Sequence, residues 1–573
     1  MNDIRRSILW VVFGFSMVLL WDQWQVYNGH KATFFPTPVP ASATAANPAA
    51  PATPAAAQPA DASVPAATGS AAAAGTVPEP GAAAAATRTQ HTVSSDVLRL
   101  VIDSQGATIV RAELLKHDAR TPPPKGEPTQ PMVLLETDKQ YAAQTGLVGT
   151  QLPNHTTPMT LTSSATTLAD GQDSLELRFE SPVLGGVKLV KVYTLQRGAY
   201  DIAVRHEAHN LGSAAIAPQL YHQLVRDGSV AGSATPFYST FTGPVVYSST
   251  AKYQKVEFSD LDKGKATFEK TAADGYVAMV QHYFASAWLL PDGARENYVD
   301  RVTVNNAARY RTGAISALPE VAPGQSQAVE ARLFLGPQDE KLLERLTPGL
   351  ELVKDYGWLT ILAKPLYWLL EKIHGFVSNW GWSIVLLVVL IKAAFYWLNA
   401  TAYRSMAKMK AINPRIMEMR ERLKSNPQQM QQEMMKIYRE EKVNPLGGCF
   451  PIMVQIPVFI ALYWVLLSSV EMRNAPWVGW IVDLSTPDPF YILPFVMALT
   501  TVVQTALNPT PPDPMQAKLM WYMPLIFSVM FFFFPAGLVL YWITNNVLTI
   551  VQQAYINHSM GVPFQFNLPW SKK

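Results

Sequence analysis

Five long apolar runs in the last third of the chain constrain its fold more than any other feature. Each run approaches the roughly 20 apolar residues that a helix needs to cross the hydrocarbon core of a bilayer. Charged residues make up only 16% of the chain, which is low for a soluble protein of this length. The sequence therefore predicts an α-helical membrane protein whose C-terminal spans cover residues 380–400, 449–470, 490–507, 518–534 and 538–558.

A sixth span is predicted at the N-terminus, over residues 1–24. Arg5 and Arg6 precede an uncharged run, residues 7–21, in the manner of a signal sequence. No small-x-small cleavage site closes this run, and the first plausible site, residues 41–43, follows about twenty residues too late. The pattern favours an uncleaved anchor over a cleaved signal. Positive charge stays on the cytoplasmic side, so we expect the N-terminus there.

The chain changes character twice after the anchor. Residues 25–90 are rich in Ala and Pro with almost no charge, and such a segment is predicted to be a disordered tether. Residues 91–345 contain short stretches that alternate apolar and polar side chains, such as residues 174–179 and 187–192. This period-two pattern predicts an all-β sandwich. Its place after an anchor with a cytoplasmic N-terminus predicts that this domain lies in the periplasm.

Residues 351–378 lead from the predicted β domain to the first C-terminal span. Leu362, Leu366 and Ile373 recur at helical spacing beside Lys364 and Lys372. Trp, Tyr and Lys residues at this density are typical of a helix that lies in the membrane interface. A helix packed on the β domain is the alternative.

The loop charges predict which side of the membrane each loop faces. Residues 401–448 hold ten Lys or Arg against five Glu, whereas residues 471–489 hold one Arg against three acidic residues. Since cytoplasmic loops carry the excess of positive charge, residues 401–448 are predicted to be cytoplasmic. With the anchor this gives six spans, five of them forming a C-terminal core. Both chain ends, including a short tail at residues 559–573, are then cytoplasmic.

The predicted cytoplasmic loop has the pattern of two amphipathic helices joined by a tight turn. Each helix carries a stripe of apolar residues along one face. Asn426 and Pro427 form a start signal for its second helix. Methionine adapts to varied apolar partners, so the stripes are candidate contacts for emerging polypeptides. The alternative is that the two stripes pack on each other. The candidate contact residues are Met406, Met409, Met430 and Met434.

Lys392 is the only charged residue within the C-terminal spans away from their ends. A charge at mid-bilayer costs about 2.5–3.5 kcal/mol on insertion scales, and it is normally paired. The spans contain no Asp or Glu, so we expect Lys392 to face water inside the helix bundle and to receive an anionic partner from elsewhere. Snorkelling is the alternative, although Ala400, at the end of the span, lies about 12 Å further along the helix.

Uncharged polar residues on several spans favour a hydrated groove around Lys392. Lipid offers such groups no hydrogen bonds, so they require partners or water. Helix packing is the usual alternative for amides. The candidates from the spans are Gln455, Gln504 and Asn545.

Three motifs in the C-terminal region resemble one known family. They are residues 406–409 (MAKM), 440–451 (EEKVNPLGGCFP) and 534–542 (FPAGLVLYW). The chain is similar to the YidC/Oxa1/Alb3 family of membrane protein insertases, in the form found in Gram-negative bacteria. The likeness is dense from residue 380 to about residue 558, and the anchor, tether and β domain agree with the family in their order.

The resemblance implies a groove that is open to the cytoplasm and to lipid and closed toward the periplasm. The family's basic groove residue falls on Lys392, where these bacteria usually have arginine. Trp397 stands where the family commonly has proline, and Tyr541 and Trp542 match positions thought to touch substrate. The β domain resembles the family's periplasmic supersandwich, which is similar to sugar-binding folds and dispensable for insertion.

The resemblance also implies the partners of the chain. They are nascent membrane proteins, the lipid bilayer and the Sec translocon, with only weak ribosome contact because the tail after His558 is short. No direct nucleic-acid binding is expected from a net charge of +3. A single cysteine and the absence of metal or nucleotide motifs predict neither a metal nor a cofactor, and no enzymatic activity.

Two other functions remain open at this point. A solute transporter or anion channel would use Lys392 as its binding site, but the internal repeats typical of transporters are missing. Alternatively, the β domain is an enzyme or a sugar-binding module. Its closest cluster, His206, Glu207 and His209, is expected at the surface of a strand end.

Overall fold

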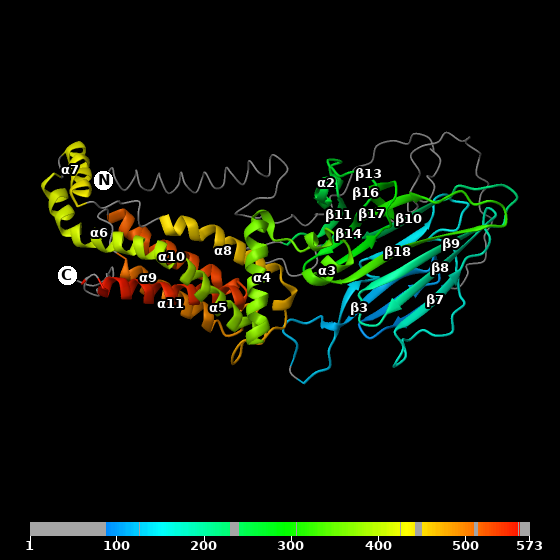
Figure 1. Ribbon diagram of the computed structural model, residues 1–573, viewed down its shortest axis with the longest axis horizontal. Coiled ribbons are helices and arrows are strands. Elements are labelled where there is room, and N and C mark those ends of the chain that lie inside the picture. The colour runs from blue at the N-terminus through cyan, green and yellow to red at the C-terminus, as the bar shows by residue number, and fades with distance from the viewer. Residues whose placement is uncertain are drawn as a thin grey trace, which may run out of the picture. The chain divides into compact units, whose positions relative to one another are not determined.

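The computed structural model describes residues 88–124, 126–229, 240–304, 306–423, 426–441, 450–508, 514–559 and 561. The expected anchor at residues 1–24, nearly all of the tether and most of the tail lie outside these residues, as does the GGC stretch of the second motif. The described residues belong to two compact units, divided between Lys354 and Asp355. Figure 1 labels the elements of both.

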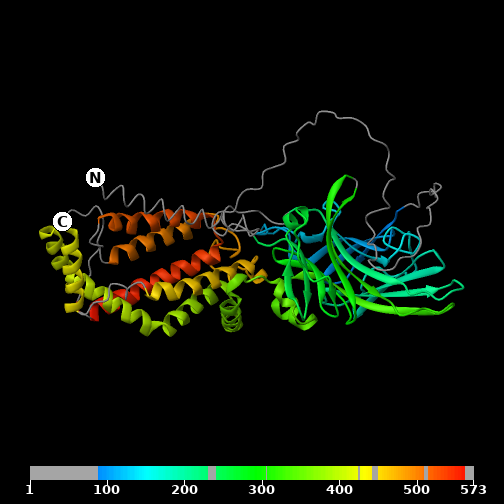
Figure 2. The same ribbon diagram turned by 90° about the horizontal axis from the view of Figure 1, so that it is seen from above.

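The first unit contains two antiparallel sheets that face one another (Figures 1 and 2). Within the described residues each sheet has nine strands. The first has the order β1 (Gln90–Ser94), β2 (Leu98–Asp103), β3 (Thr108–Asp118), β5 (Ala142–Leu147), β10 (Gln219–Arg226), β17 (Ala307–Ala317), β16 (Arg295–Val304), β13 (Thr271–Ala272), with β4 (Pro131–Leu135) beside β3. The second has the order β12 (Lys252–Lys255), β11 (Gly243–Ser248), β14 (Tyr276–Gln281), β15 (Phe284–Leu289), β18 (Ser326–Pro337), β9 (Asp201–Asn210), β8 (Val187–Gln196), β7 (Ser174–Glu180), β6 (Thr160–Leu161).

Alternating side chains build the core between the sheets. In β7, Leu175, Leu177 and Phe179 are buried while the residues between them are partly or fully exposed. Successive side chains of a strand point to opposite faces, so one face of β7 enters the core. The prediction of a β sandwich from period-two patterning is confirmed.

Strands β14 and β15 do not alternate, because both of their faces are buried. Their outer face packs under helix α3 (Glu340–Leu346) and the 3-10 turn η1 (Leu350–Val353), where Leu343 and Val353 complete a second apolar cluster. A short helix α2 (Phe258–Asp262) also belongs to this unit. Strands buried on both faces read as continuous apolar runs, so alternation alone does not reveal them.

The interior of the sandwich also contains basic side chains. Lys191 of β8 is fully buried, and its Nζ donates to the carbonyl oxygens of Gly106 and Thr145 at 2.6 and 2.8 Å. The rings of His206 and His222 meet edge to face at 5.1 Å, and both are buried. The expectation that His206 lies at the surface is therefore wrong: its strand face points to the core.

The second unit is helical. It contains η2 (Gly357–Leu359), α4 (Thr360–Val377), α5 (Trp380–Ala394), α6 (Tyr396–Arg422), α7 (Pro427–Glu440), α8 (Phe450–Ser468), η3 (Val470–Met472), α9 (Ile492–Leu507), α10 (Pro514–Met530), η4 (Phe531–Phe533) and α11 (Ala536–Ser559). Helix α11 packs against α9, α5 and α6, and α4 packs against α8 and α5. Helices α6 and α7 form a hairpin at one end of the unit (Figure 1).

One glycine allows a close approach within this unit. A Cβ atom on Gly381 of α5 would lie 2.2 Å from Cδ1 of Trp477, in the segment between η3 and α9. No real Cβ contact is that short, so any larger residue would force Trp477 away from the helix. Glycine at 381 thus fixes this segment against the start of α5.

Among the described residues, no helix taken singly has both the length and the apolar character required to cross a membrane. One bent pair, Trp380–Ala394 with Tyr396–Ser405, meets the requirement when its two parts are taken together.

We predict that the β unit loses stability in mild acid. Burial, with the nearby Lys191 and Arg295 charges, lowers the pKa of His222 to about 3, and burial holds the pKa of His206 well below its usual value. The unfolded chain then binds more protons than the folded one below pH 6.5. Accordingly, the free energy of unfolding falls as the pH drops, by about 2 kcal/mol at pH 5 for His222 alone.

Denaturant unfolding of the full chain at pH 7 and pH 5 measures this effect. Burial lowers the pKa of Lys191 to about 7, so Lys191 is protonated in both the folded and the unfolded chain at pH 5. Lys191 therefore contributes little to the pH dependence of the free energy of unfolding below pH 6. His222→Gln should flatten the pH dependence, because it removes the buried imidazole whose pKa is lowered. Equal stability at both pH values would contradict the prediction.

Candidate functional site

The helix that carries Lys392 is bent directly after it. Helices α5 and α6 join at Phe395, whose backbone angles are −92° and 11°, and their axes differ by 65°. Beyond the bend, α6 continues without a break to Arg422. The structure differs here from the expected boundary at residue 400, because the predicted span and the first arm of the predicted hairpin share one helix.

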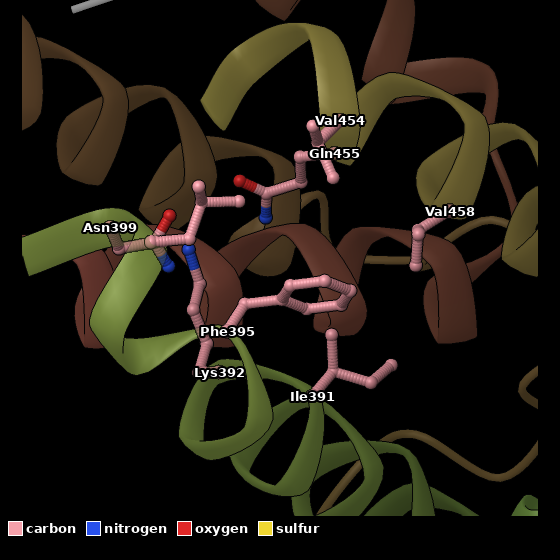
Figure 3. Close-up of a pocket in the computed structure, with 8 residues that line it drawn as sticks. Ile391, Lys392, Phe395, Asn399, Val454, Gln455 and Val458 are labelled. Atoms are coloured by element: carbon pink, nitrogen blue, oxygen red, sulfur yellow. The ribbon is translucent and has the colours of Figure 1, made fainter. Parts of the chain in front are cut away.

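A small cavity lies at this bend. Its volume is about 20 Å³, which is room for roughly one water molecule. Side chains from both sides of the bend and from α8 form its wall, and Figure 3 shows Lys392 and Gln455 pointing into it from different helices. The lining residues are Ile391, Lys392, Phe395, Leu398, Asn399, Val454, Gln455 and Val458.

Lys392 is buried, with only 8% of its surface exposed. Its Nζ donates to Oγ1 of Thr549 on α11 at 2.9 Å. Within the part of the chain that the structure describes, no carboxylate pairs with this ammonium group. A neutral hydroxyl compensates a buried charge only in part, so the site favours an anionic group at Nζ.

A second polar contact joins α8 to α11 near the same cavity. Gln455 donates from Nε2 to Oδ1 of Asn545 at 2.6 Å. Asn545 and Thr549 are one helical turn apart, so both lie on the same face of α11. This face therefore supplies polar partners to α5 and to α8.

Three of the predicted groove residues lie elsewhere. Tyr541 is buried and stacks on Phe459 at 5.8 Å, and Trp542 meets the same ring edge to face at 4.6 Å. Gln504 is half-buried on α9. None of the three lines the cavity. The two aromatic residues belong to the apolar core of the helical unit, and their contact with a substrate remains a prediction.

Sequence reasoning missed Thr549, whose hydroxyl accepts a hydrogen bond from Lys392. One signal for Thr549 was available. It follows Tyr541 and Asn545 at four-residue spacing, so a helical projection places all three on one face.

The apolar stripes of the hairpin pack on each other. Ile412, Ile416, Met419 and Ile437 are buried between α6 and α7, and Met409, Met430 and Met434 pack around them. The side chain of Met406 lies outside the described residues. Ion pairs from Arg415 to Glu440 and Glu441, at 3.1 and 2.9 Å, also connect α6 to the end of α7. Asn426 caps α7 by accepting a hydrogen bond from Gln429 N.

The fold and the site define a two-part protein, in which a β-sandwich unit precedes helices that bury a lysine without a carboxylate partner among the described residues. Two family models match the chain, the YidC periplasmic domain at residues 90–369 and the 60Kd inner membrane protein at residues 372–562. The chain belongs to the YidC family, whose proteins are inner membrane proteins with a periplasmic domain.

Curated relatives support the assignment over the whole chain. The membrane protein insertase YidC of Cupriavidus metallidurans is 54% identical over 567 residues, covering 98% of both chains. The protein of the same name from Ralstonia nicotianae is 55% identical over 563 residues, again covering 98% of both. A solved structure titled as an active YidC insertase is similar over 81% of this chain and 91% of that one, with 15% identity and a TM-score of 0.35.

These relatives are insertases, and the family role is not enzymatic. None of the relatives named here is a transporter or channel, so that alternative is not supported. The match of the β unit to a periplasmic domain of the same family is likewise no support for a separate enzyme.

We predict that Ile416→Ala loosens the hairpin while its neighbour Met417→Ala does not. Ile416 is 1% exposed and Met417 is 46% exposed. Removing the buried side chain should cost about 2–4 kcal/mol, against less than about 0.5 kcal/mol at the surface. Amide hydrogen exchange in α6 and α7 measures local opening. Equal protection in both variants would show that the stripes do not hold the hairpin together.

Proposed function

We propose that this chain inserts membrane proteins into the inner membrane and helps them fold. The observation that carries the proposal is the buried ammonium of Lys392, which has a hydroxyl partner and no carboxylate partner among the described residues. Such a group attracts the acidic, polar segment of a substrate. The curated relatives, which are named membrane protein insertases, support the same function.

The attraction between the Lys392 ammonium and an acidic group of the substrate depends on how much water surrounds the two charges. Two unit charges 4 Å apart gain about 1 kcal/mol in water and about 4 kcal/mol at an effective dielectric of 20. A partly dry groove thus strengthens the contact and shortens the apolar path of the polar segment. Burial of the substrate's apolar helix in lipid then drives insertion, and no bond is made or broken.

The cavity at Lys392 must widen before a polypeptide segment enters. Its volume of about 20 Å³ accommodates roughly one water molecule. The cavity wall includes Leu398 and Asn399, beyond the bend, and Val454 and Gln455 on α8. We propose that α6 and α8 separate on the cytoplasmic side to form the groove.

We propose a topology of six spans with both chain ends in the cytoplasm. The spans are the N-terminal anchor, α5 with the first turns of α6, α8, α9, α10 with η4, and α11. The 19 residues of α8 extend about 28 Å, close to the roughly 30 Å of a bilayer core. The basic loop at residues 401–448 supports the orientation. The β unit then lies in the periplasm.

Helix α4 is proposed to lie at the periplasmic surface of the inner membrane, in the interface between lipid and water. Its inner face, with Ala363, Leu370 and Ile373, is buried, whereas Ile361 and Phe376 are almost fully exposed. Exposed apolar side chains of this size mark a surface that meets lipid or protein.

The proposed partners of the whole chain are nascent membrane proteins, the bilayer, the Sec translocon and, weakly, the ribosome.

We predict that Lys392→Ala stops insertion of substrates whose translocated tails are acidic, and that Lys392→Arg retains it. Arginine preserves the charge, and it is the residue that related proteins usually carry there. Reconstituted vesicles with a protease-protected substrate tail measure insertion. The control Lys518→Ala removes the same charge from an exposed position of α10 and should insert normally. Normal insertion by the Lys392→Ala variant would exclude the proposed role of this lysine.

A further inference from the structure

Two polar groups lie close to the hydroxyl oxygen of Thr549. Lys392 Nζ lies 2.9 Å from Oγ1, and the main-chain oxygen of Asn545 lies 2.6 Å from it. Thr549 is 5% exposed, so water does not readily replace these contacts.

The direction of each hydrogen bond follows from the chemistry of the groups. A hydroxyl offers one donor and two acceptor lone pairs, an ammonium group only donates, and a carbonyl oxygen only accepts. The single Thr549 donor therefore goes to Asn545, and one of its lone pairs receives Lys392. The backbone of α11 thus orients this hydroxyl toward the ammonium group.

The contact joins two helices next to the bend at Phe395. Lys392 precedes the bend on α5, and α11 packs against α5. One side chain of α11 therefore fixes the ammonium group in the cavity wall.

We propose that Thr549 is a positioning residue, which holds the Lys392 ammonium in the cavity. The inference rests on the proposed function. An acidic side chain of a substrate then replaces the hydroxyl as the partner of Lys392, because a carboxylate is the stronger acceptor.

Hydroxyl removal at matched positions tests the positioning role. Thr549→Val keeps the shape of the side chain, and Thr549→Ser keeps the hydroxyl. Thr544→Val is the control, because Thr544 donates in the same way to Leu540 O at 2.8 Å. Insertion into reconstituted vesicles is measured for one substrate with an acidic tail and for the same substrate with its Asp and Glu changed to Asn and Gln.

The expected result is selective. Thr549→Val should insert the acidic substrate at least about threefold less than the native protein, since hydrogen bonds to charged groups are the stronger ones. The neutral substrate should change much less, and Thr549→Ser and Thr544→Val should match the native protein. Equal loss for both substrates, or failure of serine to rescue, would overturn the positioning role, because a folding defect would give that pattern.

The Lys392→Ala variant separates this inference from the function itself. Loss of insertion in Lys392→Ala together with normal insertion in Thr549→Val overturns the inference and leaves the proposed function standing. Normal insertion by Lys392→Ala overturns both the inference and the proposed role of Lys392.

Discussion

The free energy of keeping a charged ammonium group inside a helix bundle governs the arrangement of the helical unit. An isolated buried charge is costly unless polar groups compensate it. Lys392 receives that compensation from Thr549, 157 residues further along the chain, and Gln455 and Asn545 add a second polar contact between α8 and α11. Helices α5, α8 and α11 must therefore pack with their polar side chains toward one another near Lys392. The ammonium group of Lys392 remains able to bind an anionic ligand.

The two units differ in the side chains that they bury and in those that they expose. The β unit encloses Lys191, His206 and His222 between its sheets, where backbone carbonyls and neutral rings surround them. The helical unit exposes large apolar side chains instead, among them Phe495 and Ile526. Exposed apolar side chains of that size fit contact with lipid or with another protein.

Several structural features followed directly from residue patterns. Alternation in β7 marked its core face, and the Asn426-Pro427 signal marked the start of α7. Other features did not follow. Strands β14 and β15 are buried on both faces, so they carry no alternation. The bend at Phe395 has neither proline nor glycine at that position, and Tyr541 turned inward to stack on Phe459 instead of lining the cavity.

Sequence alone determined the class of fold, the apolar segments, the loop charges and the choice of Lys392 as the exceptional residue, because periodicity and charge are local properties of the chain. Only the tertiary structure decided which groups meet Lys392. Thr549 reaches Lys392 through the packing of α11 on α5, and the 65° bend brings residues on both sides of Phe395 into one cavity wall. Such contacts depend on helices far apart in the sequence, and no local pattern specifies their distance or rotation.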